Sequence, residues 1–165
     1  MKNILILNGA SRKNGNTANL IKSFIKGAES VGHDISEFYL QNMNIQGCLG
    51  CDNCMNGECS QKDDMSEIYD AFDDADVVVF ASPIYFWTIT GTLKTATDRL
   101  YAKLKSLGYG DFARESVLIM TAGSTDYSQA QNWYETFERN LGWKNRGEVL
   151  GAGKTKEAEQ LAKEL

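Results

Sequence analysis

Residues 2–17 read KNILILNGASRKNGNT, and this segment indicates the fold class. The run over residues 4–7 is apolar and ends in Asn8 and Gly9, as expected of a strand that is buried on both faces of a parallel sheet. From Thr17 to about residue 29, apolar residues recur at steps of three and four, which predicts an amphipathic helix. A buried strand followed directly by a helix is the first unit of a β-α repeat.

The same alternation of strand and helix continues along the chain. Apolar runs predict further strands over residues 34–40, 77–81, 116–121 and 146–150. Helical spacing predicts helices over residues 65–72, 93–104, 130–141 and 156–165. Five β-α repeats imply an α/β fold, a doubly wound five-stranded parallel sheet in the order 2-1-3-4-5 with helices on both faces. No linker or internal repeat interrupts the pattern, so residues 1–165 are expected to form a single domain.

Composition limits the classes of function. The chain has 42% hydrophobic and 24% charged residues, which is ordinary for a folded protein. Its formal net charge of −5 argues against a nucleic-acid partner, because binding the phosphate backbone requires clustered Lys and Arg. The apolar run at residues 4–7 is too short for a signal peptide, and the run at 77–81 is too short for a membrane span. A cytoplasmic protein without a membrane partner is therefore expected.

The predicted topology directs attention to three loops. In open α/β sheets, ligands bind at the carboxyl ends of the strands, near the switch point between strands one and three. The loops at that edge span residues 9–16, 82–90 and 122–127.

The first of these loops is suited to an anion. It lies between a strand and a helix, where free backbone N–H groups and the helix dipole attract negative charge. Ser11, Asn16 and Thr17 add hydrogen-bond donors, and Arg12 adds positive charge. The alternative is a polar, capped turn with no ligand. A nucleotide-hydrolysing P-loop is excluded by its spacing, because a Lys would be needed where Asn16 stands.

The second loop carries three consecutive aromatic residues, Tyr85, Phe86 and Trp87, where a surface turn is usually polar. Together with Pro83 and Ile84 they offer a flat, apolar slot for a planar ring such as an isoalloxazine. The alternative is that these aromatic side chains belong to the core or to a dimer contact. The third loop, residues 122–127, is small and polar enough to close over such a ring from the other side.

The combined pattern resembles the flavodoxin-like NADPH-dependent FMN reductase family over most of the chain. Residues 8–11, read as NGAS, and residues 15–17, read as GNT, match its phosphate loop, and residues 82–85, read as SPIY, match its flavin loop. The resemblance implies bound FMN, NAD(P)H as co-substrate, and a homodimer or higher homo-oligomer whose partner chain adds aromatic residues to the site. The implied phosphate contacts are Ser11, Arg12, Asn14, Asn16 and Thr17. The implied ring contacts are Pro83, Ile84, Tyr85, Phe86 and Trp87, with a third loop at Ala122, Gly123 and Ser124.

Four cysteines in the loop at residues 47–64 indicate a metal or redox site. Their spacing is Cys-x2-Cys-x2-Cys-x4-Cys, over Cys48, Cys51, Cys54 and Cys59. This resembles the motif of the iron-sulfur flavoproteins, in which a 4Fe-4S centre exchanges single electrons with FMN, and implies that the four cysteines are its ligands. A four-thiolate zinc site, an oxidation-sensitive thiol pair, or a loop without metal remain alternatives. Because the loop follows strand two, it is expected at the same edge as the flavin.

The remaining polar candidates are interpreted as structural, so no catalytic side chain is predicted. His33, the only histidine, lies at a helix-strand junction, and Asp63 and Asp64 directly precede Met65, where carboxylates cap a helix. The chemistry is then that of a cofactor. We expect an FMN-dependent NAD(P)H oxidoreductase that passes electrons to a small acceptor, such as a quinone or a flavin, or through a 4Fe-4S cluster. The alternative is an electron carrier that shuttles electrons between protein partners without substrate turnover.

Overall fold

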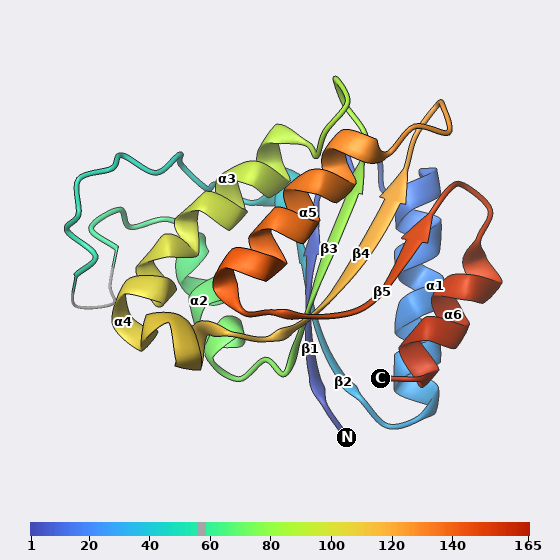
Figure 1. Ribbon diagram of the computed structural model, residues 1–165, viewed down its shortest axis with the longest axis horizontal. Coiled ribbons are helices and arrows are strands. Elements are labelled where there is room, and N and C mark those ends of the chain that lie inside the picture. Colours follow the sequence, from blue (N-terminus) through green and yellow to red (C-terminus); the bar gives the residue numbers. More distant parts are fainter. Residues whose placement is uncertain (56–58) are drawn as a thin grey trace.

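The computed structural model describes residues 1–55 and 59–165 (Figure 1). Its strands are β1 Asn3–Asn8, β2 Asp34–Tyr39, β3 Val77–Pro83, β4 Glu115–Thr121 and β5 Lys144–Leu150. Its helices are α1 Asn16–Ser30, η1 Leu40–Asn42, α2 Met65–Asp73, α3 Gly91–Arg99, α4 Tyr101–Phe112, α5 Ser128–Leu141 and α6 Thr155–Lys163. All strand pairs are parallel and the sheet order is β2-β1-β3-β4-β5. The predicted fold class is confirmed.

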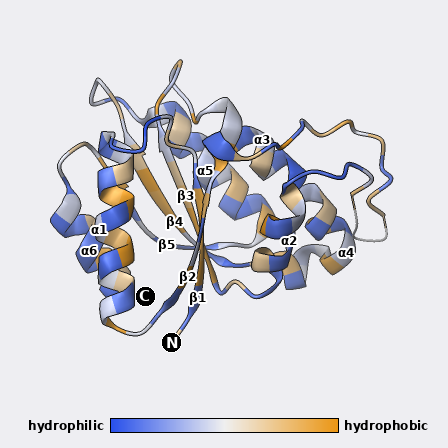
Figure 2. Ribbon diagram, turned by 180° about the vertical axis from the view of Figure 1, so that it is seen from behind, coloured by the Kyte–Doolittle hydropathy of each residue, from blue (hydrophilic) through white to orange (hydrophobic). Residues whose placement is uncertain are grey.

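Two helical layers enclose the sheet. Helices α1 and α6 cover one face, and α2, α3, α4 and α5 cover the other (Figure 1). Figure 2 shows hydrophobic residues along the central strands and hydrophilic residues on the outer sides of the helices. In β1 and β3, neighbouring residues alternate between the two cores, which explains why these strands are apolar throughout.

Close contact between α1 and α6 depends on a glycine. A Cβ atom at Gly27 would collide with the carbonyl oxygen of Glu159 in α6. Glycine therefore allows the two helices to approach backbone to backbone.

The predicted helix over residues 93–104 is two helices in the structure. Helix α3 ends at Arg99, and α4 starts at Tyr101. Leu100 at the junction is buried, so the apolar spacing continues across the break and gives the sequence pattern of one helix. Helix α4 extends to Phe112, with a kink at Gly108, whose φ is 72°. Within the described ranges, no helix has the length and apolar character needed to cross a membrane.

Candidate functional site

A cleft opens at the carboxyl ends of β1, β3 and β4. Its volume is about 200 Å³. Its lining comes from the three loops identified in the sequence and from the ends of their neighbouring elements: Ala10, Ser11, Arg12, Gly15, Asn16, Thr17, Pro83, Ile84, Tyr85, Thr121, Ala122 and Gly123.

The loop after β1 is folded so that its helix end faces this cleft. Asn8 accepts a hydrogen bond from the N–H of Ala10 at 2.9 Å, and the N–H of Gly15 donates to the carbonyl oxygen of Arg12 at 3.1 Å. Gly15 is the N-cap of α1 and has no side chain to cap it. Residues 16–18 lie in the first turn of α1, and the backbone N–H groups of a first turn have no acceptor within the helix. They are therefore available to an anion in the cleft.

A hydroxyl pair joins this helix to β4. The Oγ1 atoms of Thr17 and Thr121 lie 2.7 Å apart, and both residues are buried. Thr17 stands in the first turn of α1, and Thr121 is the last residue of β4. The bond fixes the amino end of the helix against the carboxyl end of the sheet.

Thr90 holds the loop after β1 against the aromatic loop. Its hydroxyl donates to the carbonyl oxygen of Gly9 at 3.1 Å and accepts from the N–H of Leu93 at 3.4 Å, which caps α3. The N–H of Thr90 in turn donates to Oγ of Ser82 at 2.9 Å. A Cβ atom at Gly9 would lie 2.8 Å from the Thr90 hydroxyl oxygen, so only glycine fits this contact.

The aromatic loop ends in a strained two-residue turn. Tyr85 and Thr88 form an antiparallel bridge, with N···O distances of 3.0 and 3.3 Å. Between them, Phe86 and Trp87 have φ values of 47° and 68°, in the region that favours glycine or asparagine. Their side chains are 89% and 63% exposed. The hydroxyl groups of Tyr85 and Ser11 are 2.5 Å apart and connect this turn to the loop after β1.

Most of the residues predicted for the site line the cleft: Ser11, Arg12, Asn16, Thr17, Pro83, Ile84, Tyr85, Ala122 and Gly123. The other four lie beside it. Asn14 accepts a hydrogen bond from Lys22, Ser124 accepts one from the N–H of Asp126, and Phe86 and Trp87 form the exposed tip of the turn. Sequence reasoning missed Thr121, although its place as the last residue of a predicted strand put it at the correct edge of the sheet.

The chemistry of the cleft fits a phosphorylated flavin. The free N–H groups of α1, the hydroxyls of Ser11 and Thr17 and the guanidinium of Arg12 suit a phosphate. The lining residues include no carboxylate that would repel it. Pro83, Ile84, Ala122 and Gly123 also line the cleft, and they provide an apolar border for a planar ring.

The cysteine loop lies elsewhere. It extends beside α2 and α4, whereas the loops of the cleft lie at the carboxyl edge of the sheet (Figures 1 and 2). Of the described residues in 47–64, that is 47–55 and 59–64, none lines the cleft. After η1 the described residues of this loop turn outward and lie beside the helices, so the expectation that the loop lies at the same edge as the cleft is not met within one chain.

The four cysteines have the donor chemistry of a four-thiolate centre. Cys48 and Cys51 are exposed, and Cys54 and Cys59 are half-buried against the core. Within residues 1–55 and 59–165, no group of three or more His, Cys, Asp or Glu side chains is close enough to hold a metal ion. The donor set thus fits a cluster or zinc in kind and number, but the thiols are not gathered here.

The thiols differ in acidity. Hydrogen bonding by the backbone of Asn53, and then by the hydroxyl of Ser60, lowers the pKa of Cys51. Burial raises the pKa of Cys54. Cys51 is therefore the more readily ionised of these two potential ligands.

Asp63 does more than cap α2. It accepts a hydrogen bond from the N–H of Met65 at 3.2 Å, but its carboxylate also forms a two-pronged ion pair with Arg99, at 2.7 and 3.1 Å. Burial disfavours the charged carboxylate, yet the hydrogen bonds from Arg99 and from the N–H groups of Gln46 and Met65 outweigh it and lower the pKa of Asp63. The capping interpretation of Asp63 was thus incomplete, and Arg99 was missed. For Asp64 the interpretation was wrong: it is the N-cap residue of α2, but its side chain makes no capping bond.

Comparison with known proteins relates the sequence to flavin enzymes. A family model described as NADPH-dependent FMN reductase matches residues 2–139. An iron-sulfur flavoprotein from Archaeoglobus fulgidus is 35% identical over 96 residues, which cover 58% of this chain and 47% of that protein. A Bacillus subtilis protein named as an NAD(P)H-dependent FMN-containing oxidoreductase is 27% identical over 158 residues, 91% of this chain and 84% of its own. The chain spans about half the length of the curated iron-sulfur flavoproteins it matches.

Solved structures share the fold. An NAD(P)H:quinone oxidoreductase from Methanothermobacter marburgensis has a TM-score of 0.72 and 18% identity, over 97% of this chain and 94% of that one. A Bacillus subtilis structure titled Trp repressor binding protein has a TM-score of 0.69 and 23% identity, over 98% and 99% of the two chains. At these identities the likeness concerns the fold alone.

Proposed function

The chain belongs to the NADPH-dependent FMN reductase family, and from this premise we propose that it holds FMN in the cleft and transfers reducing equivalents from NAD(P)H to a small acceptor such as a quinone or a flavin. In this proposal residues 1–165 act as one FMN-binding domain, as a homodimer or higher homo-oligomer. When bound, FMN supplies hydride and single-electron transfer, and the protein supplies binding and orientation.

The observation that carries the proposal is the open amino end of α1. Gly15 leaves the first turn uncapped, and the hydroxyls of Ser11 and Thr17 stand beside it. A phosphate bound there receives backbone N–H bonds and the positive end of the helix dipole. Arg12 adds a guanidinium at the rim, and Asn14 and Asn16 are further proposed contacts.

The proposed ring site lies between the second and third loops. Pro83, Ile84 and Tyr85 of the second loop and Ala122 and Gly123 of the third line the cleft, and Ser124 is a further proposed contact beside it. The cleft volume of about 200 Å³ is below the roughly 300 Å³ of a small enclosed ligand pocket. Because the cleft is too small to enclose a ring fully, a ring held there stays accessible on one side. A nicotinamide or an acceptor can approach from that side. The exposed side chains of Phe86 and Trp87 then offer aromatic surface to these planar molecules.

The cysteine loop is proposed as a four-thiolate site for a 4Fe-4S cluster with Cys48, Cys51, Cys54 and Cys59 as ligands. The donor set supports this, and several relatives carry the name iron-sulfur flavoprotein. Zinc is the competing occupant of such a site.

An anaerobic assay tests the enzymatic proposal. The FMN-loaded chain is mixed with NADPH, and separately with NADH, and flavin absorbance is followed before and after a quinone is added. We expect NAD(P)H to bleach the flavin and the quinone to restore it over many turnovers. Absence of steady-state NAD(P)H oxidation in a flavin-loaded chain would instead support the electron carrier. Iron, sulfide and zinc analysis of freshly purified protein identifies the occupant of the cysteine loop.

A further inference from the structure

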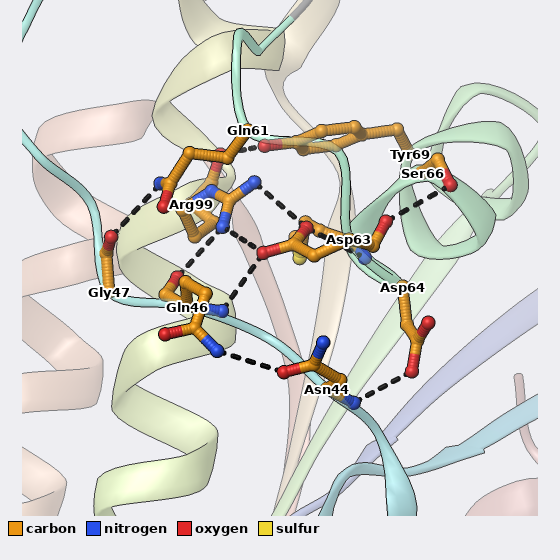
Figure 3. Close-up of polar contacts among 10 residues, drawn as sticks. Asn44, Gln46, Gly47, Gln61, Asp63, Asp64, Ser66, Tyr69 and Arg99 are labelled. Carbon is orange, nitrogen blue, oxygen red and sulfur yellow. Dashed lines mark hydrogen bonds and ion pairs between the residues drawn. The ribbon is translucent and has the colours of Figure 1, made fainter.

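The two ends of the cysteine loop, residues 44–47 and 61–64, are joined by hydrogen bonds and form a stem. At the base of the stem, the N–H of Asp64 donates to the carbonyl oxygen of Asn44 at 3.1 Å, and the N–H of Asn44 donates to the carboxylate of Asp64 at 2.7 Å. One step further out, the side-chain amide of Gln61 donates to the carbonyl oxygen of Gly47 at 3.0 Å (Figure 3). Residues 44–47 and 61–64 thus run side by side, just before the first cysteine and after the last.

Arg99 connects the two sides of this stem. Its guanidinium donates to the carbonyl oxygen of Gln46 at 2.7 Å on one side of the stem and to both carboxylate oxygens of Asp63 on the other. The carboxylate of Asp63 also accepts the N–H of Gln46 at 2.9 Å, so the three residues form a closed ring of bonds (Figure 3). The side chains of Arg99 and Asp63 are only 1% and 3% exposed.

The helices beneath the loop fix the position of Arg99. It is the last residue of α3, and its carbonyl oxygen accepts a hydrogen bond from the hydroxyl of Tyr69 in α2 at 2.9 Å. The stem is thereby attached to two helices that pack against the sheet. Beyond the stem, Cys48 and Cys51 are exposed, so the core does little to position them.

Stability alone is a poor explanation for this ion pair. A buried ion pair is often no more stabilising than apolar residues of the same size, because both charges lose their hydration. Nε of Arg99 is also buried without a hydrogen-bond partner among the described residues. Buried pairs of this kind are better suited to fixing one geometry, and here that geometry brings together the two ends of a loop that carries four thiols.

We propose that Arg99 is a positioning residue for the cysteine loop: through Asp63 and Gln46 it holds the two ends of the loop together so that the thiolates close around one metal centre. The inference rests on the four-thiolate site proposed above and adds to it the element that holds the two ends of its loop together. Because the stem is already closed, metal binding has to overcome a smaller entropic cost of ordering the loop.

Cobalt binding tests the proposal without reference to activity. The full chain, loaded with FMN and freed of other metals under anaerobic, reducing conditions, is titrated with Co²⁺ and thiolate-to-cobalt charge-transfer absorbance is recorded. Arg99→Lys keeps the buried charge but loses the two-pronged bond. Arg99→Met combined with Asp63→Asn removes both charges, so no unpaired ion is left buried. Lys94→Met is the matched control, because Lys94 pairs with Asp98 on the exposed side of the same helix.

We expect Co²⁺ affinity to fall about 10–100-fold in Arg99→Lys, as for other residues that orient metal ligands, and at least as far in the double variant, while Lys94→Met equals wild type. FMN affinity, which reports on the fold at the distant cleft, stays unchanged in all three. Wild-type Co²⁺ affinity in both Arg99 variants would overturn the proposal. A loss of FMN affinity parallel to that of Co²⁺ would also overturn it, because Arg99 would then serve the fold in general. If wild type itself gives no thiolate-cobalt spectrum, both this inference and the four-thiolate site fail, whereas the FMN site is judged by its own titration.

Discussion

The hydroxyl oxygens of Thr17 and Thr121 lie 2.7 Å apart in the floor of the cleft and join the first turn of α1 to the last residue of β4. Both residues belong to the lining of the cleft, so the pair helps to shape it.

Replacing the first of these hydroxyls tests its role in phosphate binding. Thr17→Val keeps the shape of the side chain but removes a hydrogen bond to a charged group, which contributes about 1.5–3 kcal/mol. We expect the Kd for FMN to rise by at least about tenfold, measured by quenching of flavin fluorescence. Thr155→Val, at the first turn of α6 outside the cleft, is the control and leaves the Kd unchanged. Equal FMN affinity in the two variants would exclude Thr17 as a phosphate contact.

The approach of the phosphate loop to Thr90 makes Gly9 sensitive to substitution. In Gly9→Ala, the new Cβ would lie 2.8 Å from the hydroxyl oxygen of Thr90 and 2.9 Å from Cβ of Leu93. Overpacking of this kind costs about 1–3 kcal/mol. We expect a lower free energy of unfolding and weaker FMN binding. Gly91→Ala, two residues before Leu93, meets no atom within 4 Å and serves as the matched control. A Gly9→Ala protein as stable as the control would show that this contact is not tight.

The strained aromatic turn is expected to trade stability for function. Phe86 and Trp87 both have positive φ, a geometry that Asn-Gly adopts readily. The double variant Phe86→Asn, Trp87→Gly should therefore be more stable, by about 1–3 kcal/mol for the relieved strain, while turnover with a quinone falls because the exposed aromatic surface is lost. Thermal unfolding and steady-state kinetics measure the two effects. The control is Tyr109→Asn, which removes another exposed aromatic side chain from α4. Unaltered quinone kinetics in the double variant would assign the turn a role outside catalysis.

Much of the fold could be predicted because β1 and β3 are buried on both faces and are therefore continuously apolar. The position of the cleft followed from topology, since the loop after β1 opens at the carboxyl edge of the sheet. The break between α3 and α4 could not be predicted, because buried Leu100 preserves the helical spacing across it.

The buried position of Arg99 was not predicted from the sequence because of its residue type. A charged residue in a helix is usually solvated, and its partner Asp63 is 36 positions away in the sequence. A signal was present, however: Arg99 lies three residues after the buried Ala96 and therefore on the same face of α3. The path of the cysteine loop was mispredicted for a related reason. The strand end fixes where a loop starts, but the stem contacts that direct it over the helices are long-range.

The ion pair between Asp63 and Arg99 gives stability a defined pH dependence. The folded-state pKa of Asp63 is lowered from 3.8, so the contribution of the carboxylate is present above that value and is lost as the pH falls through the lower folded-state pKa. At neutral pH, Asp63→Asn should destabilise the chain by about 3–5 kcal/mol, because it leaves Arg99 charged and buried. The difference from wild type should shrink as the pH drops below 3.8, as measured by urea unfolding at a series of pH values.

The control for this series is Asp98→Asn, which breaks the exposed pair with Lys94. Exposed pairs of this spacing contribute about 0.3–0.5 kcal/mol, so its effect should be small at every pH. A constant difference between Asp63→Asn and wild type across the acid range would contradict the lowered pKa.

The most direct test of the account is an equilibrium titration of the flavin-free chain with FMN and, in parallel, with riboflavin, which lacks the phosphate. We predict that one FMN binds per chain, that riboflavin binds at least about a hundredfold more weakly because the charge-assisted bonds at the end of α1 are missing, and that Thr17→Val narrows this difference. Equal affinity for FMN and riboflavin, or no flavin binding at all, would contradict the assignment of the cleft.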